Sequence, residues 1–177
     1  MVSTHGEGYR LVRGDVVVGE AGVKGLGVFA RRDFARGEFI FRRRHGNVVR
    51  NNEIASLPEE GQRHLCELDF ETSAVLLPPG CYLNHSCDPN AMRSGVNVYA
   101  WRDIRVGEEI TIDYRLNAHD GERWACDCGA ATCQGYVIGD FFSLDAERQR
   151  AYLLYAPPFI RKEYRRRAAL SHHSETR

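Results

Sequence analysis

The stretch CYLNHSCDPN, residues 81–90, places Asn, His, Ser and Cys side by side and closes with a proline and an asparagine. Polar residues of this kind usually form a turn on the surface. The apolar and aromatic residues that lead into them, Cys81, Tyr82 and Leu83, do not fit that interpretation by themselves. The stretch therefore raises two questions: why apolar residues lead directly into polar ones, and what Cys87 binds.

Length and composition are those of one globular domain. The 177 residues are 43% hydrophobic and 27% charged, which is enough to bury a core. The formal net charge is zero, which argues against wholesale wrapping of nucleic acid. Only two of the 24 basic residues are lysines, a bias that often reflects GC-rich coding and that hints at a bacterial source.

The sequence predicts a soluble protein made in a reducing compartment, with no membrane partner. The N-terminus lacks an apolar run of signal-peptide length, and no stretch approaches the ~20 residues that span a bilayer. In such a compartment the six cysteines are better interpreted as metal ligands or buried thiols than as disulfides.

Most of the chain is expected to be strand. Short β-branched or alternating apolar runs lie at 16–18, 27–32, 38–42, 96–102 and 108–114, whereas 51–70 and the segment after Ser143 read as short helices. RDFARGEFI (32–40) and RDIRVGEEI (102–110) share one pattern, which we interpret as two similar hairpins that turn through Gly37 and Gly107. The segment 121–135 is expected to be a loop.

Three cysteines in that loop predict a metal site. Cys126, Cys128 and Cys133 follow the spacing C-x-C-x4-C, so pairing into disulfides would leave one over. Tetrahedral zinc needs one more thiolate, and Cys87 is the natural fourth ligand. A site with four protein ligands is structural, because no position remains for water. The alternative is four buried small residues, and Cys66 and Cys81 are interpreted in that way.

Four motifs in order resemble one known family. NHSCDPN (84–90), GEEITIDY (107–114), KGLGVFA (24–30) and C-x-C-x4-C-x-G (126–135) resemble the signature motifs of SET-domain protein lysine methyltransferases. The match spans roughly residues 10–138. It implies a mainly β fold with a few short helices, of the SET (β-clip) type, in which the Asn-His-Ser segment is threaded through a pseudoknot core.

The resemblance also implies a site for S-adenosylmethionine. The glycine turn would approach the methionine part of the cofactor with its backbone, Asn84 would meet its amino end, and His85 would serve through its backbone and packing rather than as an acid or base. An aromatic residue after the zinc loop would cover the adenine. The candidate cofactor residues are Lys24, Gly25, Leu26, Gly27, Asn84, His85 and Tyr136.

Tyr114 is the candidate catalytic residue. Methyl transfer from a sulfonium to an amine mainly needs alignment and a neutral lysine, which a phenol oxygen at the end of an apolar channel can orient. Tyr82 and Tyr99 are candidate channel walls, and Ile112 should share the face of Tyr114 because the two lie two apart on a strand. The resembled family usually has Tyr or Phe at that position, so Ile112 predicts room for di- or trimethyl-lysine.

These observations predict a SET domain (1–120), a post-SET zinc loop (121–138) and a C-terminal helical extension with a basic tail (139–177). The expected partner is a protein substrate, a histone or another basic protein, without direct reading of nucleic acid; the chain would be cytoplasmic if bacterial and nuclear if it acts on chromatin. One alternative is an inactive SET-like module that binds a partner with the zinc loop and the basic tail. A second, a zinc-finger-like nucleic-acid binder, is disfavoured by the neutral charge.

Overall fold

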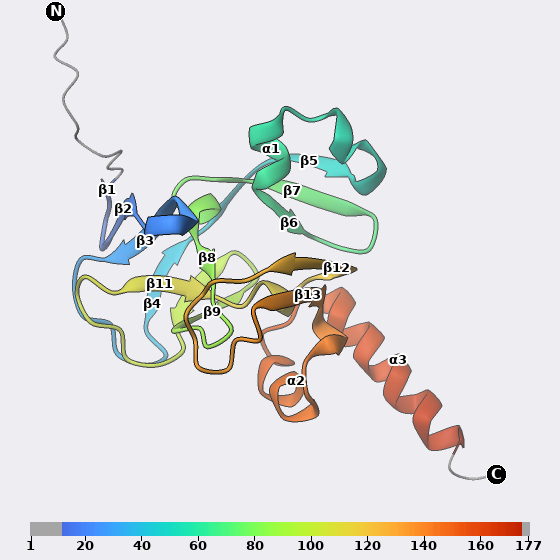
Figure 1. Cartoon of the computed structure of the whole chain (residues 1–177). Helices are drawn as coiled ribbons and strands as arrows, with labels where there is room; N and C mark the ends of the chain where they lie inside the picture. The colour runs from blue at the N-terminus through green and yellow to red at the C-terminus, as the bar shows by residue number, and fades with distance from the viewer. Residues whose placement is uncertain (1–11, 175–177) are drawn as a thin grey trace, which may run out of the picture.

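The computed structural model describes residues 12–174 and is built mainly of short strands in four sheets (Figure 1). The strands are β1 Val12–Arg13, β2 Val16–Glu20, β3 Leu26–Ala30, β4 Phe39–Arg42, β5 Arg44–Arg50, β6 Leu65–Glu67, β7 Thr72–Leu77, β8 Asn84–His85, β9 Ala91–Ser94, β10 Asn97–Ala100, β11 Glu109–Ile112, β12 His119–Ala125 and β13 Tyr136–Asp140. The α-helices are α1 Glu59–Arg63, α2 Ala146–Tyr152 and α3 Pro158–Ser174. Short 3-10 helices cover Gly22–Lys24, Asn51–Ser56, Gly80–Tyr82, Tyr114–Leu116 and Phe141–Ser143.

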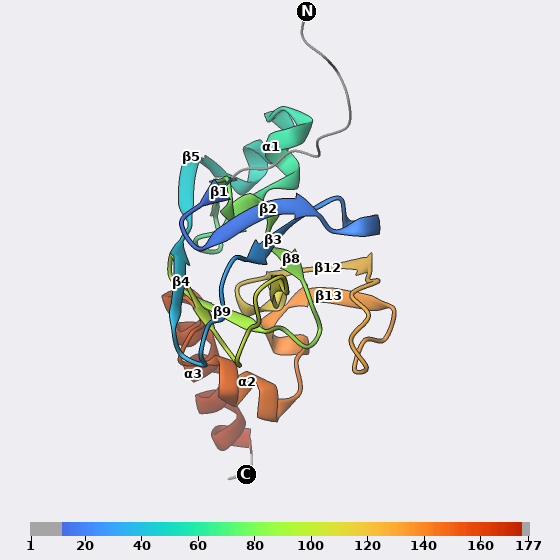
Figure 2. The same cartoon turned by 90° about the vertical axis from the view of Figure 1, so that its left-hand side faces the viewer.

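The sheets are small and joined by crossovers. The largest has the order β1-β2-β3-β11-β8, and the others are β4-β10-β9, β5-β7-β6 and the pair β12-β13. Among the strands that the structure describes, β8 and β11 form the single parallel pair. In both views the sheet β5-β7-β6 with α1 lies at one end of the molecule and α2 and α3 lie at the other (Figures 1 and 2). The mainly β fold expected from the sequence is confirmed.

The two repeated segments, 32–40 and 102–110, pair with each other in an arrangement that we call the clasp, and the prediction of two separate hairpins is wrong. β3 pairs with β11 and β4 with β10, so each strand that flanks a repeat pairs with a strand of the other copy. Phe34 and Ile104 exchange backbone hydrogen bonds of 2.8 and 2.9 Å. Asp33 Oδ1 accepts from the Val106 amide at 2.8 Å, and Asp103 Oδ1 accepts from the Arg36 amide at 2.9 Å.

The glycine of each repeat does form a turn. Gly37 and Gly107 have φ angles of +84° and +86°, a region that favours residues without Cβ. Their amides donate to the carbonyls of Ala100 and Ala30, both at 2.8 Å. The Gly37 turn is therefore bonded to the last residue of β10, and the Gly107 turn to the last residue of β3.

A second core joins the C-terminal extension to the rest of the fold. Met92, on β9, and Leu116 are buried together with Phe141, Tyr152 and Ile160 of the extension. Because this apolar surface is shared, α2 and the start of α3 pack as part of the same body rather than as an appended tail. The basic run on α3 is partly neutralised from within, since Glu163 bonds Arg166 and Arg167 at 2.7 and 2.8 Å.

Two other segments depart from the sequence expectation. The expected short turns in 51–70 are present, but the segment ends in β6, which pairs with β7 rather than continuing a helix. The segment 121–135 is a loop only from residue 126 onward, because β12 runs to Ala125 and pairs with β13. In both places the partner strand, β7 or β13, lies outside the segment, so the local sequence pattern could not predict the pairing.

Asn90 fastens the Asn-His-Ser stretch to β11. It is 3% exposed, its Nδ2 donates to the Glu109 carbonyl at 2.8 Å, and its Oδ1 accepts from the Thr111 amide at 2.9 Å. The side-chain amide of Asn90 thus hydrogen-bonds β11 as a backbone peptide group of a neighbouring strand would, although β8 ends at His85.

Asn90→Ala should lower the free energy of unfolding by roughly 2–4 kcal/mol, because two buried backbone groups of β11 lose their partners. Denaturant unfolding monitored by circular dichroism measures this loss. Asn52→Ala, at an exposed position of the 3-10 helix Asn51–Ser56, is the matched control and should change stability by less than about 0.5 kcal/mol. Equal effects of the two variants would contradict a structural role for Asn90.

Candidate functional site

The parallel pairing of β8 with β11 brings the first two motifs together. Asn84 lies opposite Thr111 and His85 opposite Ile112, and the Ser86 amide donates to the Ile112 carbonyl at 2.9 Å. His85, Ser86 and Cys87 are all buried, so the polar stretch is interior and Leu83, 2% exposed, is the packed residue that leads into it. The threaded pseudoknot itself stays a prediction.

The glycine turn meets Asn84 at a close approach of backbone and side chains. A Cβ on Gly27 would fall 2.7 Å from Glu109 Oε1 and 2.9 Å from the Ala21 Cβ, so no larger residue fits without displacing them. Gly25 has a φ of +77°, which only glycine adopts readily. Lys24 reaches from the same turn to form a part-buried ion pair with Glu109. The candidate residues of this turn therefore gather around Glu109, which sequence analysis missed.

The hydrogen bonds of Asn84 define which of its atoms is left for a ligand. Its Nδ2 donates to the Leu26 carbonyl at 3.0 Å and to Glu109 Oε1 at 2.7 Å, which uses both amide protons. Oδ1 is then the atom that can accept a hydrogen bond from an ammonium group. The cradle of Gly27, Asn84 and Glu109 therefore suits the amino end of an amino acid, which is the part of S-adenosylmethionine that the resemblance assigns to it.

His85 connects this region to the cysteines. Burial lowers the pKa of His85 to about 4, so the ring is neutral near pH 7. Nδ1 accepts a hydrogen bond from the Tyr114 amide at 3.2 Å, so Nε2 carries the proton and lies 3.4 Å from the Cys87 sulfur. Both ring nitrogens thus have structural partners, and the role of His85 through packing rather than acid-base chemistry stays a prediction.

Tyr114 begins a 3-10 helix rather than ending a strand. The helix is capped by Asp113, whose Oδ1 accepts from the Arg115 amide at 3.1 Å, and the 1% exposed Asp113 carboxylate is bound by Arg115 Nε and Nη2 at 2.9 and 2.8 Å. The Tyr114 hydroxyl donates to the Leu83 carbonyl at 2.7 Å. Burial raises the pKa of Tyr114 to about 12, so the oxygen is a phenol and not a phenolate near neutral pH.

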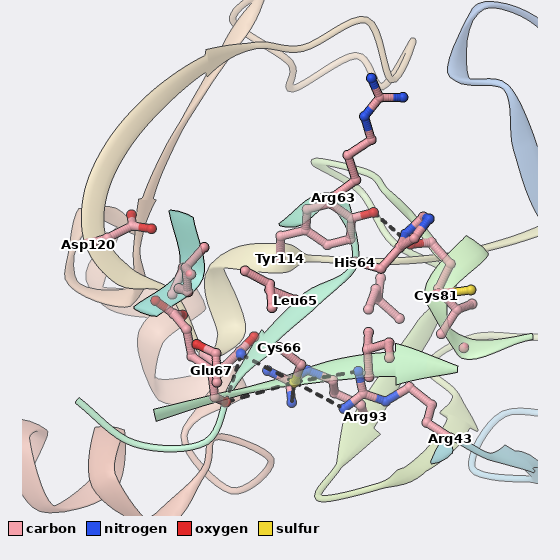
Figure 3. A pocket seen from close by; sticks show the side chains of 18 of the residues that line it. Arg43, Arg63, His64, Leu65, Cys66, Glu67, Cys81, Arg93, Tyr114 and Asp120 are labelled. Atoms are coloured by element: carbon pink, nitrogen blue, oxygen red, sulfur yellow. Dashed lines mark hydrogen bonds between the residues drawn. The ribbon is translucent and has the colours of Figure 1, made fainter. Parts of the chain in front are cut away.

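Tyr114 and Ile112 line one cavity of about 370 Å³, which also reaches Leu83, Cys66 and Cys81 (Figure 3). Tyr82 does not line this cavity: it packs against the adjoining core, with its ring 5.6 Å from that of His64, which does line it, so its role in a channel stays a prediction. Tyr99 is placed elsewhere: it lies on β10, its ring contacts Phe39 and its hydroxyl accepts from Asn97 at 3.3 Å. Its role in a channel stays a prediction, as does that of Tyr136, whose ring is covered by Arg123 at 3.8 Å.

The four predicted cysteines come together. The sulfur atoms of Cys87, Cys126, Cys128 and Cys133 all lie within 4.8 Å of one another. Ligands about 2.3 Å from a tetrahedral zinc ion would be separated by about 3.8 Å, so a small contraction satisfies that geometry. The amides of Cys87 and Gly135 point at the sulfurs of Cys128 and Cys133, both at 3.4 Å, as expected around thiolate ligands. The donor set therefore fits zinc.

Three residues that matter here were not singled out from the sequence: Glu109, Asn90 and Asp113. All lie inside the quoted motifs, but their letters do not say which way the side chains point. A signal was available for Asp113. It lies between Ile112 and Tyr114, two residues typical of strands, and Arg115 follows two positions later, a pattern that predicts a buried ion pair.

Comparison with known proteins agrees with this geometry. The family model described as SET domain matches residues 25–115, just over half of the chain. A histone-lysine N-methyltransferase, H3 lysine-36 specific, of Yarrowia lipolytica is 31% identical over 133 residues, which cover 66% of this chain and 17% of that protein. The histone-lysine N-methyltransferase SUV39H2 of Xenopus tropicalis is 28% identical over 152 residues, covering 66% of this chain and 36% of that protein. The chain thus spans only a minor part of these relatives.

A solved structure shows the same fold. The methyltransferase domain of human histone-lysine N-methyltransferase SETMAR has a TM-score of 0.53 and 23% identity, with 70% of this chain and 57% of that chain covered. In the part of the chain that the structure describes, no helix is long and apolar enough to cross a membrane. With the family match over the motifs that build the cradle and carry Tyr114, the chain belongs to the SET-domain family.

Proposed function

We propose that the chain is an S-adenosylmethionine-dependent methyltransferase that acts on lysine side chains of a protein. The observation that carries the proposal is the position of Tyr114: its hydroxyl bonds the carbonyl of Leu83, the residue directly before Asn84, and it lines a cavity with Ile112. One hydrogen bond therefore joins the candidate catalytic residue to the candidate cofactor cradle. The relatives named as histone-lysine methyltransferases support the same conclusion.

The cofactor, when bound, supplies a methyl group on a positively charged sulfur. The chain holds its amino end through Asn84 Oδ1, which Glu109 and the Leu26 carbonyl orient by taking both amide protons. Gly27 leaves room for the close backbone approach. Because these partners are fixed before binding, little reorganisation is needed when the cofactor arrives.

Tyr114 aligns the amine and does not remove its proton. Its hydroxyl proton is committed to Leu83, so the oxygen lone pairs are left to face the amine and the partly positive methyl group. With a pKa of about 12 the phenol is a poor base at neutral pH. The substrate lysine must therefore enter neutral, and the apolar wall of Ile112 and Leu83 favours this because desolvation lowers the pKa of an amine.

The substrate class is proposed to be a basic protein, of which a histone is the first candidate. The support for this class comes from the relatives named as histone-lysine N-methyltransferases, since the exposed edge of the cavity carries both acidic side chains, Asp120 and Glu122, and a basic one, Arg63. A histone substrate would require the chain to act in the nucleus. The division into a SET domain (1–120), a post-SET zinc loop (121–138) and a helical extension (139–177) is part of the same proposal.

The alternative is an inactive module that binds a partner with the zinc loop and basic tail. The internal pairing of Glu163 with Arg166 and Arg167 disfavours it, because less free charge remains on α3 for a partner. Incubating the purified chain with radiolabelled S-adenosylmethionine and a panel of histones and other basic proteins separates the two functions. Cofactor binding by calorimetry without label on any protein would favour the binding module.

Tyr114→Phe should lower kcat by about a hundredfold or more while the cofactor Kd stays unchanged, because only the aligning oxygen is lost. Steady-state kinetics and calorimetry provide the two values. Tyr155→Phe, which removes a phenol oxygen from a ring that packs edge-on against Trp101, is the control and should keep full activity. A Tyr114→Phe enzyme with half of the activity would show that another group aligns the amine.

Ile112→Tyr should restrict the product to monomethyl-lysine, whereas the unmodified chain should reach di- or trimethyl-lysine. The side chain of Ile112 borders the cavity beside Tyr114 and is smaller than an aromatic ring, so the methylated amine has space to rotate. Mass spectrometry of a product peptide at long reaction times measures the distribution, with Ile138→Tyr on the exposed side of β13 as the control. Monomethyl-lysine alone from the unmodified chain would overturn the assignment.

The four-cysteine site is proposed to hold one structural zinc ion, with Cys87, Cys126, Cys128 and Cys133 as ligands. Cys128→Ser, or removal of the metal by a chelator, should raise hydrogen exchange in residues 121–137 and weaken cofactor binding through His85, while the core sheets stay protected. Exchange followed by mass spectrometry tests this. Cys81→Ser should leave the metal content unchanged, and elemental analysis that finds no zinc in clean protein would refute the proposal.

A further inference from the structure

Cys66, which the proposed chemistry does not use, is surrounded by hydrogen-bond donors at the base of the cavity (Figure 3). Its sulfur receives Arg43 Nη1 and Nη2 at 3.7 and 3.6 Å, Arg93 Nη1 at 3.8 Å and Asn117 Nδ2 at 3.7 Å. A guanidinium group and an amide nitrogen can only donate, so these four contacts require the sulfur to accept. One further contact, 3.8 Å to the Glu67 carbonyl, is one in which a thiol would donate, so accepting contacts outnumber donating contacts by four to one. This arrangement suits a thiolate better than a thiol.

The charges around the sulfur favour the same state. Arg43 and Arg93 are 3% and 5% exposed, and within residues 12–174 neither forms an ion pair with a carboxylate. Burial, followed by the charge of Asp120, raises the pKa of Glu67 to about 8, so this neighbour is largely protonated near pH 7. Two buried cations without a compensating anion are costly. The Cys66 sulfur is the group in contact with both that can supply the negative charge.

The acidity of the thiol follows from these neighbours. Burial acts against the thiolate, but the charges of Arg93 and Arg43 and the hydrogen bond from Arg43 together lower the pKa of Cys66. Cys81 lines the same cavity and is less buried, yet burial without such cations raises its pKa to about 11. The chain therefore offers two thiols on one cavity wall with opposite tendencies to ionise.

Among the described residues, two further buried donors of the same arginines lack an acceptor. Arg43 Nε and Arg93 Nη2 are buried and have no hydrogen-bond partner in the described part of the protein. Buried donors are rarely left without an acceptor. An oxygen bonded to the Cys66 sulfur would add an acceptor among these groups, and the cavity that Cys66 lines extends to the exposed residues Arg63 and Glu122.

We propose that Cys66 is a reactive thiolate that takes up oxygen from small uncharged peroxides, with hydrogen peroxide as the simplest, and is held as a sulfenate by Arg43 and Arg93. The sulfur electron pair forms the S–O bond as the O–O bond breaks. The departing hydroxide takes the proton of the new S–OH group and leaves as water. Sulfur is oxidised by two electrons and the peroxide is reduced by two. This reaction is independent of methyl transfer.

Alkylation rates resolved by cysteine test the thiolate. The purified, metal-loaded chain is treated with iodoacetamide at several values between about pH 6 and pH 8, and the modified peptides are quantified by mass spectrometry. Cys66 should react at least about tenfold faster than Cys81 near neutral pH, and its rate should rise less steeply with pH than the rate at Cys81, which should rise about tenfold per pH unit. A slower rate at Cys66, or the same steep rise, would overturn the proposal.

Peroxide chemistry is tested on the same sample. Brief exposure to hydrogen peroxide with dimedone, which traps sulfenic acids, should label Cys66 and leave Cys81 unlabelled. The Cys66→Ser chain should lose this label. Label on Cys81 with none on Cys66 would refute the proposal, because exposure rather than the arginines would then decide the reaction.

A pair of isosteric variants tests the charge without relying on access to the sulfur. Cys66→Asp places a fixed anion between Arg43 and Arg93, and Cys66→Asn places a neutral group of the same shape there. If the two arginines require an anion, the Asp variant should have the higher melting temperature. An Asn variant that melts at the same or a higher temperature would show that no negative charge is needed.

Discussion

The parallel pairing between Asn84–His85 and Thr111–Ile112 is the contact on which the rest of the site depends. It sets Asn84 beside Gly27, aims the ring of His85 at both Tyr114 and Cys87, and places the Leu83 carbonyl within reach of the Tyr114 hydroxyl. A shift of the pairing by one residue would turn every one of these side chains to the other face. Asn90 continues the pairing where the strand ends and so helps to fix its register.

The sequence was informative where spacing alone decides the outcome. Three cysteines within a few positions, together with Cys87 in a second motif, have few ways to be satisfied, and the structure gathers all four sulfurs. The glycine turns were also predictable, because a positive φ at Gly25, Gly37 and Gly107 is a local property. Local signals of this kind do not depend on which strand the chain meets later.

The sequence did not predict contacts between residues that lie far apart along the chain. The hairpin interpretation of the repeats failed because β3 pairs with β11, far along the chain, rather than with β4, the next strand, which pairs with β10. For the same reason the surroundings of Cys66 could not be anticipated: Arg43, Arg93 and Asn117 come from separate segments and meet only when the sheets pack. Asp113 shows the opposite case, since its counter-charge, Arg115, is two residues away and holds it at 1% exposure. The buried charge of Asp113 is thus balanced by a residue close in the sequence, whereas Arg43 and Arg93 meet Cys66 only through the tertiary fold.

The clasp between the two repeated segments has a consequence for how the chain is made. Asp33 and Val106 are bonded although 73 residues separate them, and β3 has no partner on one side until β11 exists. During synthesis the N-terminal half therefore leaves the ribosome with an open strand edge and an unanchored turn. Contacts of such separation slow folding, because the intervening chain must be ordered before they form. The first half of the protein stays exposed to chaperones and to self-association until its second copy of the motif has been translated.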